Sequence, residues 1–465
     1  MEPGTNRAQL LAEHARESTR GAVQALSCKS IDIAVLRSEL PTSLQVDIDL
    51  TRFLVPGDTV MWGQAMAEPL TLTRALVAQR QALSRLRIFV GIGTSDTLSP
   101  EQTDAFDFIG YTASGTHRAL ATAGVLDILP GHYSQLPRLI SSGALRIGGG
   151  MVEVSPPDEH GRYSLGLAHE YLVAALASAR VIIAEEHPDV PWVHGERSLC
   201  AADIHALVPS RHELIEPTAG VARSVDQAIA RHVAGLVEDG STLQIGIGTL
   251  PETVVAALGD RRDLGLHTGA AGDAVAALAQ AGVLTNARKA IDRGAAVAGL
   301  LMGGKLLRQW AHRNPALQMR GTQYTHDHGV LAALDKLVAI NSAMEVDLTG
   351  QINSEVAGGV YMGAVGGAVD FMRGAQQSRG GLPILALPST AGNASRIVAR
   401  LSGPVSTSRA DAGIVVTEHG VADLRGQTLS RRVRRMIDIA APEHRADLDK
   451  QAFEQLRLAG ARLAI

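Results

Sequence analysis

Two segments of this chain place polar or acidic residues directly after apolar runs that predict buried strands. The run 337–340 is followed by a polar stretch, 341–355, which begins with Asn341, and the run 414–417 is followed by Glu418. Open α/β folds place ligands at the carboxyl ends of their strands. A carboxylate desolvated there has a raised pKa, which suits acid–base chemistry. A solvated loop at the first position, and a helix-terminal or ion-paired carboxylate at the second, stay open as alternatives.

Two glycine segments have the composition of loops that approach a ligand closely. Gly246-Ile247-Gly248 lies between a predicted strand and a predicted helix, where free N–H groups and the helix dipole favour an anion or an oxyanion. Gly366-Gly367 either presents N–H groups to a ligand or forms a turn with positive φ. The first segment has Pro251 where a dinucleotide fingerprint needs its third glycine. This departure argues against a nicotinamide-dependent oxidoreductase.

The elements that must position these segments are those of an α/β protein. Short apolar runs alternate with helical stretches, at residues 88–90, 181–184, 337–340 and 384–386 among others. The chain has 48 glycines and only 3% aromatic residues, a composition that fits buried parallel sheets packed closely by their helices. The predicted fold is therefore α/β with mainly parallel, open sheets.

Two features recur in the same order in the two halves of the chain. Residues 54–63 are echoed by 236–246, and residues 151–155 by 343–347. A period near half the chain length is too long for a solenoid repeat and predicts two homologous α/β domains. We place them, with a boundary near Pro209–His212, at residues 1–212 and 213–465.

Composition and charge bound the class of protein. The formal net charge of −4 gives no electrostatic argument for binding nucleic acid or an anionic membrane. The basic run Arg431–Arg435 is interpreted as a solvated helix face. Met1–Arg7 is not followed by the apolar core of a signal peptide, and no apolar run approaches the roughly 18 residues that span a bilayer. We expect a soluble, cytoplasmic protein.

Metal and disulfide chemistry find little support in the spacing of ligands. Cys28 and Cys200 lie far apart in unlike contexts and indicate neither a disulfide framework nor a cysteine metal site. His326-Asp327-His328 groups three potential ligands, but no second cluster with ligand spacing follows. We therefore predict no metal site.

Taken together, these segments resemble the acetyl-CoA hydrolase/transferase family, which includes the acetate, butyrate and 4-hydroxybutyrate CoA-transferases. The resemblance runs from about Pro56 to about Leu448 and is carried in the first half by residues 155–161, Ser-Pro-Pro-Asp-Glu-His-Gly. In the second half it is carried by several segments in the same order: 285–289, 341–351, 366–371, 386–390 and 416–426.

The resemblance implies an active site in a cleft between two α/β domains. Backbone N–H groups near Ile247 and Gly366-Gly367 would form an oxyanion hole for the thioester carbonyl, and Glu418 matches a second carboxylate near that site. We expect five residues to contact the substrate or its CoA: Gly246, Gly248, Asn341, Gly269 and His267.

The family's reaction fixes the substrates that the resemblance implies. A glutamate attacks the acyl-CoA, CoA returns to form a glutamyl-CoA thioester, and a second carboxylate resolves it. The implied partners are an acyl-CoA and a small carboxylate, with CoA thioester as substrate and no permanently bound cofactor. A homo-oligomer, specifically a homodimer, is expected.

The chain departs from the family at the nucleophile. The family's segment reads His-Thr-Glu with an aspartate four residues after the glutamate, and this chain keeps His267, Thr268 and Asp273 but has Gly269 in place of the glutamate. Glycine has no side chain, so the covalent relay cannot run through this position. His267 lies beside the vacant position and is either part of the site or a satisfied structural histidine.

Four interpretations remain. In the favoured one, another carboxylate, Glu418 or Glu345, is the nucleophile of a CoA-transferase, since the rest of the scaffold matches. Alternatively, Glu418 activates water and the protein is an acyl-CoA hydrolase. A third possibility is a ternary-complex reaction with another acceptor in the room left by Gly269. The fourth is a protein that binds acyl-CoA without turning it over.

Overall fold

The computed structural model describes residues 48–217 and 220–458. These residues belong to one compact unit, Val46–Ile465. Met1–Arg7 and Cys28, considered above, lie outside the described residues.

The first half of the described chain builds a seven-stranded sheet in which every neighbouring pair is parallel. Its first strand, β1 (Thr59–Trp62), lies in the interior of the sheet. In spatial order the strands are β4 (Leu126–Ile128), β3 (Phe106–Gly110), β2 (Leu86–Val90), β1, β5 (Gly149–Val154), β7 (Val181–Glu186) and β9 (Ala206–Pro209).

The second half builds an eight-stranded sheet with the same kind of order. It is parallel except for its last strand, which pairs antiparallel at the edge. In spatial order the strands are β13 (Leu317–Met319), β12 (Ala296–Leu301), β11 (Gly265–Ala271), β10 (Thr242–Ile245), β14 (Leu337–Asn341), β19 (Leu382–Ala386), β23 (Ile414–Thr417) and β24 (Gly420–Asp423). In each sheet the chain starts in the interior, builds outward to one side, and then crosses to the other. The prediction of an α/β fold with mainly parallel sheets is confirmed.

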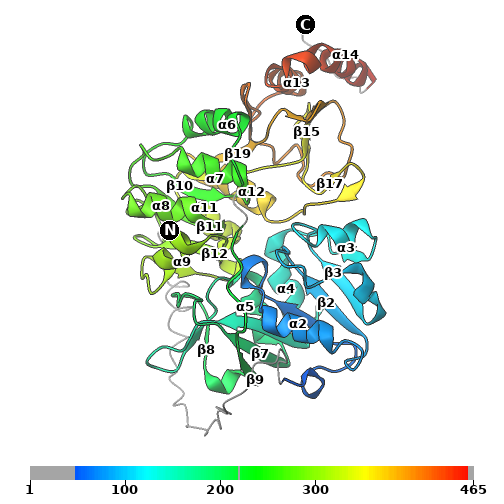
Figure 1. Ribbon diagram of the computed structural model, residues 1–465. Coiled ribbons are helices and arrows are strands. Elements are labelled where there is room, and N and C mark those ends of the chain that lie inside the picture. The colour runs from blue at the N-terminus through cyan, green and yellow to red at the C-terminus, as the bar shows by residue number, and fades with distance from the viewer. Residues whose placement is uncertain (1–47, 218–219, 459–465) are drawn as a thin grey trace, which may run out of the picture. The chain divides into compact units, whose positions relative to one another are not determined.

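Helices cover both faces of each sheet (Figure 1). Side chains alternate along a strand, so Val338 and Ile340 of β14 pack in one apolar cluster with α6 and α7, whereas Leu337 and Ala339 pack in another with α11 and α12. The first half contains α2 (Leu70–Ala78), α3 (Arg118–Thr122), α4 (Leu136–Ser141) and α5 (Glu170–Ser178). The second half contains α6 (Ser224–Ala234), α7 (Thr249–Ala256), α8 (Asp273–Gln280), α9 (Lys305–Ala311), α10 (Thr322–Thr325), α11 (His328–Ala333), α12 (Ala368–Gln377), α13 (Leu429–Asp438) and α14 (Pro442–Leu458).

Smaller elements decorate the two main sheets. Three short strands form a separate sheet, β15 (Glu345–Asp347), β16 (Ile352–Asn353) and β22 (Ile397–Val398). Two-stranded ribbons pair β6 (Tyr163–Ser164) with β8 (Ser198–Leu199), β17 (Val356–Ala357) with β18 (Val360–Tyr361), and β20 (Thr390–Ala391) with β21 (Ala394–Ser395). Single 3₁₀ turns occupy Leu50–Arg52, Ala65–Ala67, Pro100–Asp104, Tyr133–Gln135 and Ala201–Asp203.

The two sequence echoes have different outcomes. Thr59 and Thr242 begin β1 and β10, which hold equivalent interior places in their sheets. The second echo is wrong, because residues 151–154 belong to β5 of a main sheet whereas Glu345–Asp347 form β15 outside it. By position, the counterpart of β5 is β14. The predicted boundary at 212/213 falls between the two sheets, and the exact division into domains stays a prediction.

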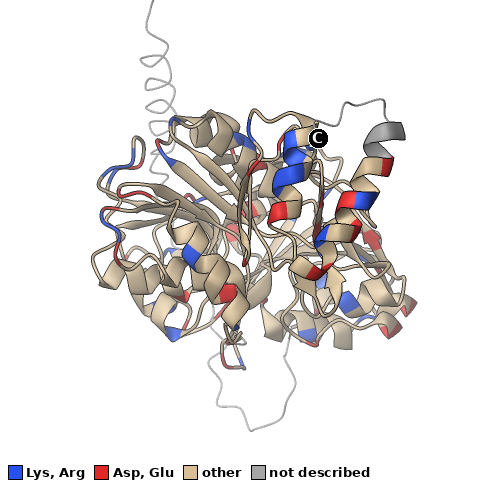
Figure 2. Ribbon diagram, turned by 90° about the horizontal axis from the view of Figure 1, so that it is seen from above, with Lys and Arg blue, Asp and Glu red and all other residues tan. Residues whose placement is uncertain are grey.

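The basic run lies on the amphipathic helix α13, whose ribbon is largely blue in Figure 2. Arg431 and Arg434 are exposed, while Val433 is buried. Arg432 donates to the carbonyl oxygen of Thr349 at 3.0 Å. The run therefore both faces solvent and anchors the helix. Among the described residues, no helix has the length and apolarity needed to cross a membrane.

Candidate active site

The glycine loop after β10 lies at the point where the second sheet reverses its strand order, between β10 and β14. Such a crevice at the carboxyl ends of parallel strands is where open α/β sheets bind ligands. The N–H of Gly246 donates to Ile340 O at 2.8 Å, so the N–H groups that remain for a ligand are those that follow it. Gly248 has a φ of +117°, which L side chains rarely adopt, and it precedes α7 directly.

The second glycine segment meets this crevice from a different part of the chain. Gly366 has a φ of +61°, and its carbonyl oxygen accepts a hydrogen bond of 2.9 Å from the N–H of Tyr133. Gly367 then precedes α12. The bond to Tyr133 ties this loop to the first half of the chain, so residues of both halves surround the crevice.

A cavity of ≈ 330 Å³ lies where these loops converge. Six of the residues predicted from the sequence line it: Gly246, Ile247, Gly269, Asn341, Gly366 and Gly367. The first half of the chain contributes polar side chains that the sequence did not single out: Gln64, Tyr111, Tyr133 and Glu170. The cavity is thus lined by glycine loops, by polar side chains of the first half and by apolar side chains that include Leu300 and Phe371.

Asn341 and Gln244 hold each other in the wall of this cavity. Asn341 Nδ2 donates to Gln244 Oε1 at 2.9 Å, and Gln244 Nε2 donates to Asn341 Oδ1 at 3.3 Å. The reciprocal pair links the ends of the adjacent strands β10 and β14. It fixes both amides as polar groups beside the glycine loop.

Three predicted residues lie outside the set that lines the cavity. Glu418 accepts hydrogen bonds from Ser389 N at 2.9 Å and Ser389 Oγ at 2.7 Å. Gly248 lines two neighbouring hollows instead. His267 is fully buried, its Nε2 lies 3.1 Å from Thr325 O, and burial together with the charge of Lys289 lowers its pKa to about 3. Its Nδ1 is buried and has no hydrogen-bond partner among the described residues, and its place in the site stays a prediction.

The ring of His326 fills the space beside Gly269. A Cβ placed on Gly269 would lie 3.1 Å from His326 Cε1 and 3.3 Å from His326 Nε2. The ring is confined by the aromatic rings of Phe371 and Tyr133, whose centroids lie 4.5 and 5.0 Å from its own. A side chain at position 269 would therefore compete with this imidazole for space.

His326 is a neutral imidazole that faces the cavity. Burial lowers the pKa of His326 to about 3. Its Nδ1 lies 2.8 Å from Thr325 Oγ1, a hydroxyl that can either donate to this nitrogen or accept from it. The ring lines the cavity.

Glu170 supplies a carboxylate to the same cavity. It is 2% exposed, and its Oε2 accepts hydrogen bonds of 2.6 Å from both Tyr133 Oη and Gln64 Nε2. Tyr111 Oη donates to Gln64 Oε1 at 2.7 Å, which orients the amide so that its nitrogen faces the carboxylate. Burial raises the pKa of Glu170 to about 7, against the opposing effect of these hydrogen bonds. No pattern in the sequence marks Glu170, because it follows no apolar strand and becomes part of the site only when the halves pack.

Two further hollows adjoin the cavity. Both share Ile247 with it, and their volumes are ≈ 560 and ≈ 390 Å³. The larger is lined by Thr249 and Glu252 of α7, and the smaller by Arg223 and Arg396. The side chain of Ile247 is 53% exposed where these spaces meet.

Comparison with known proteins places this site in a family. The acetyl-CoA hydrolase/transferase N-terminal domain matches residues 28–207, and the C-terminal domain of the same name matches residues 303–452. The 4-hydroxybutyrate coenzyme A transferase of Clostridium kluyveri is 36% identical over 395 residues, 84% of this chain and 92% of that protein. The chain belongs to the acetyl-CoA hydrolase/transferase family. The expectation of an enzyme of this family is confirmed.

Other members of the family agree in sequence and in structure. The butyryl-CoA:acetate CoA-transferase of Anaerostipes caccae is 31% identical over 432 residues, 90% of this chain and 97% of that protein. The crystal structure of RipA from Yersinia pestis superposes with a TM-score of 0.83 at 34% identity, covering 87% of this chain and 96% of that chain. The two-domain α/β fold that the resemblance implied is confirmed.

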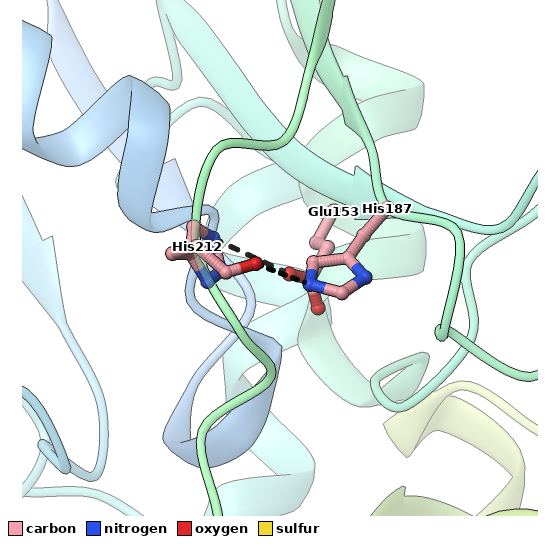
Figure 3. Close-up of side chains that lie close together, drawn as sticks. All are labelled: Glu153, His187 and His212. Atoms are coloured by element: carbon pink, nitrogen blue, oxygen red, sulfur yellow. Dashed lines mark hydrogen bonds and ion pairs between the residues drawn. The ribbon is translucent and has the colours of Figure 1, made fainter. Parts of the chain in front are cut away.

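This member of the acetyl-CoA hydrolase/transferase family also has a buried polar cluster away from the cavity (Figure 3). Glu153, His187 and His212 offer potential ligand atoms that all lie within 4.8 Å of one another. The nitrogens of His187 are engaged, because Nδ1 accepts from Asp189 N at 3.1 Å and Nε2 lies 2.9 Å from His212 O. Both ring nitrogens of His187 are therefore committed to backbone groups.

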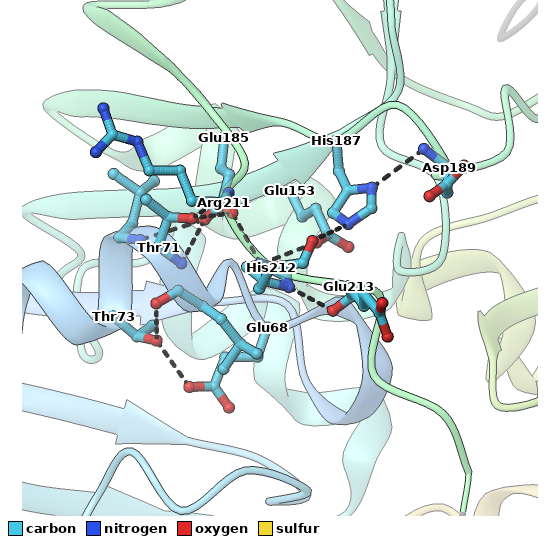
Figure 4. A network of polar contacts seen from close by, with 12 residues as sticks. Glu68, Thr71, Thr73, Glu153, Glu185, His187, Asp189, Arg211, His212 and Glu213 are labelled. Atoms are coloured by element: carbon cyan, nitrogen blue, oxygen red, sulfur yellow. Dashed lines mark hydrogen bonds and ion pairs between the residues drawn. The ribbon is translucent and has the colours of Figure 1, made fainter. Parts of the chain in front are cut away.

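One close contact in this network joins His212 to Glu185 (Figure 4). His212 Nε2 lies 2.8 Å from Glu185 Oε1. Burial is the largest single effect and acts to lower the pKa of His212, but the hydrogen bonds with Glu185 and Glu213 and the charge of Glu185 together raise that pKa above its ordinary value. Glu153 differs, because both its oxygens lack a hydrogen-bond partner among the described residues. Burial, and then the charges of Glu185 and Glu68, raise the pKa of Glu153 well above its usual value.

We expect Glu153→Gln to stabilise the protein at neutral and alkaline pH. Because the pKa of Glu153 is raised in the folded state, the folded protein holds a proton that the unfolded chain releases above about pH 4.3. The wild-type protein therefore loses stability as pH rises above that value, and glutamine removes this loss. Melting temperatures measured from pH 4.5 to 8 should diverge in favour of the variant as pH increases. Parallel curves would contradict the raised pKa.

Proposed function

We propose that the protein transfers CoA between an acyl-CoA thioester and a carboxylate. The observation that carries the proposal is the meeting of Ile247, Gly366 and Gly367 in one cavity that also holds the carboxyl group of Glu170. Backbone N–H groups of two glycine loops can stabilise an oxyanion, and a carboxylate can exchange with the thioester. The family members compared above are a 4-hydroxybutyrate coenzyme A transferase and a butyryl-CoA:acetate CoA-transferase, and both names describe this kind of reaction.

The acyl end of the substrate would occupy the cavity, with the thioester carbonyl at the N–H groups of Ile247 and Gly367. Both residues lie near the start of a helix, α7 or α12, where the helix dipole adds to the attraction for negative charge. The amides of Asn341 and Gln244 would lie beside the acyl group. A volume of ≈ 330 Å³ suits a short acyl chain together with a small carboxylate.

The CoA portion would extend over Ile247 into the adjoining hollows. Arg223 and Arg396 line the smaller of these, and guanidinium groups suit the phosphates of CoA. Glu418 interacts electrostatically with both arginines. We therefore propose that Glu418 acts at this entrance, near the thioester sulfur rather than inside the cavity.

The expectations about cofactor and substrates form part of the same proposal. The reaction needs no resident cofactor, because a carboxylate and an oxyanion hole supply its chemistry. The substrates are an acyl-CoA and a small carboxylate. The homo-oligomeric state and the cytoplasmic location inferred from the sequence stay predictions.

Exchange between defined acyl-CoAs and free carboxylates tests the proposal. The protein is incubated with acetyl-, propionyl-, butyryl- or 4-hydroxybutyryl-CoA, each with and without an isotopically labelled carboxylate, and the CoA thioesters are identified by mass spectrometry. A new acyl-CoA that carries the label and forms only when the acceptor is present is the expected result. Turnover that ignores the acceptor, or binding with no turnover of any pair, would reject CoA transfer.

Hydrolysis is a second candidate function, favoured by one observation. The neutral ring of His326 lines the cavity, and in the tautomer with its proton on Nδ1 the ring's Nε2 can accept a proton from water. A pKa of about 3 makes it a weak base, which is why transfer is the first proposal. Free CoA released at the same rate with and without acceptor would identify hydrolysis in the same experiment.

A further inference from the structure

We infer that Glu170 is the carboxylate that forms the covalent intermediates of CoA transfer, in place of the side chain missing at Gly269. The inference rests on the proposed function. Four observations support it: the position of Glu170, its orientation, its backbone conformation and the arrangement of the other carboxylates.

Glu170 lies next to Gly269 although it comes from the other half of the chain. The N–H of His169 donates to Gly299 O at 2.9 Å, which fastens the start of α5 to β12, the neighbour of β11. A Cβ built on Gly299 would lie 3.0 Å from Gly269 O and 3.6 Å from the Cβ of Glu170. Gly269 and Glu170 thus both lie against Gly299, with Glu170 at an ordinary contact distance.

The hydrogen bonds of Glu170 leave one oxygen uncommitted. Tyr133 and Gln64 both donate to Oε2, whereas Oε1 is buried and has no partner among the described residues. A buried oxygen without a hydrogen-bond partner is destabilising. An apolar residue at position 170 would not have this cost. A free oxygen on a carboxylate held in place by its other oxygen is the arrangement that nucleophilic attack requires.

The backbone at Glu170 is also strained. Its φ is +21°, a conformation that L residues rarely adopt, at the first residue of α5. Such strain persists where the surrounding structure enforces it, and it gathers at functional sites. The bonds from His169 to β12 and from Glu170 to Tyr133 and Gln64 enforce it here.

The two carboxylates considered from the sequence are less suited to the role. Glu345 Oε1 accepts hydrogen bonds from Asn353 Nδ2, Ser402 N and Ser402 Oγ, and Glu345 does not line the cavity. In Glu418 both oxygens accept bonds from Ser389, and it too lies outside the lining residues. Among the described residues that line the cavity, Glu170 is the acidic one.

The reaction through Glu170 balances without another reagent. Glu170 Oε1 attacks the acyl carbonyl carbon and CoA leaves as its thiolate, giving an acyl-glutamyl anhydride. The thiolate then attacks Cδ of Glu170 and releases the first carboxylate, which leaves a glutamyl-CoA thioester. The acceptor carboxylate attacks this thioester and expels CoA thiolate, which attacks the acyl carbon of the new anhydride. The new acyl-CoA departs and the carboxylate of Glu170 is restored.

The glutamyl-CoA thioester can be trapped and located. The wild-type protein is incubated with an acyl-CoA that it exchanges, treated with sodium borohydride to reduce the thioester to an alcohol, and digested with trypsin. Cleavage after Arg162 and Arg180 gives a peptide, 163–180, in which Glu170 is the only acidic side chain. The expected result is a substrate-dependent loss of one oxygen and gain of two hydrogens in this peptide. The same change in a peptide containing Glu345 or Glu418 would overturn the inference.

Matched variants complete the test. Glu170→Gln should lower CoA exchange by about 10³-fold or more, in line with the loss of a nucleophile in other enzymes, while acyl-CoA binding by calorimetry persists. Glu153→Gln makes the same substitution at another buried carboxylate outside the cavity and should keep full exchange. Exchange by Glu170→Gln within tenfold of wild type would overturn the inference but leave CoA transfer intact. Wild-type protein that exchanges no acyl-CoA would defeat the proposed function itself.

Discussion

The rate of CoA transfer should fall by about a hundredfold between pH 8 and pH 5 when it is measured as kcat/KM. A carboxylate attacks only when it is ionised, and burial raises the pKa of Glu170 to about 7. With that pKa, about nine-tenths of Glu170 is ionised at pH 8 and about one-hundredth at pH 5. Activity should therefore rise with pH through about 7 and level off above it.

The dependence of the rate on pH is assigned to Glu170 because the tyrosines and histidines around it do not change protonation between pH 5 and 8. Burial, followed by the charge of Glu170, raises the pKa values of Tyr111 and Tyr171 above the usual tyrosine value, and Tyr133 shifts in the same direction. Burial lowers the pKa values of His326 and of the adjacent His169 to about 3. The tyrosines thus stay protonated, and both histidines stay neutral, from pH 5 to 8.

Removing the hydroxyl of Tyr133 provides a control for this pH profile. Tyr133 Oη donates to Glu170 Oε2 at 2.6 Å, and this bond lowers the pKa of the carboxyl. Tyr133→Phe should therefore move the midpoint of the profile to higher pH while the rate at alkaline pH changes less. A substitution that only loosened the cavity would lower the rate equally at every pH. A flat wild-type profile would contradict Glu170 as the titrating nucleophile.

The sequence identifies one side of this site and misses the other for a physical reason. Ile247 and Asn341 follow strands of one sheet at their carboxyl ends, where local pattern and the logic of open sheets predict a site, and the family resemblance adds Gly366 to them. Glu170 begins a helix in the first half, and its role depends on the contact of that helix start with β12. Contacts between halves leave no periodic trace in a sequence, so this residue could not be predicted.

The same reasoning explains the uneven result for the fold. The echo of β1 in β10 reflects a strand, a glycine and a helix in sequence, which is local and therefore readable. The echo of 151–155 in 343–347 rests on a few shared letters, and only the strand order shows that β14, not β15, matches β5. Gly269 was predicted to leave an empty space, but His326, more than fifty residues away in the chain, lies against it.

Restoring the missing carboxylate by Gly269→Glu alone should reduce CoA transfer about tenfold or more rather than increase it. A Cβ at this position comes within 3.1 Å of His326, and the ring is confined by Phe371 and Tyr133. The ring must shift, and one of the two hollows that it lines is the cavity proposed to hold the acyl group. Overpacking of this kind costs about 1–3 kcal/mol, and a displaced ring also competes with the substrate.

Removing the imidazole of His326 in the Gly269→Glu variant should restore CoA exchange. In Gly269→Glu/His326→Ala the new carboxylate has the space of the imidazole, beside the same glycine loops, and exchange should exceed that of the single variant by about tenfold or more. The decisive measurement adds Glu170→Gln to this double variant. If the triple variant still exchanges CoA, the residue reduced by borohydride should be the glutamate at position 269. That result would show that a carboxylate on β11 or one on α5 can act at the same oxyanion hole. An active Gly269→Glu single variant would contradict the steric argument, because it would mean that His326 yields its place without cost.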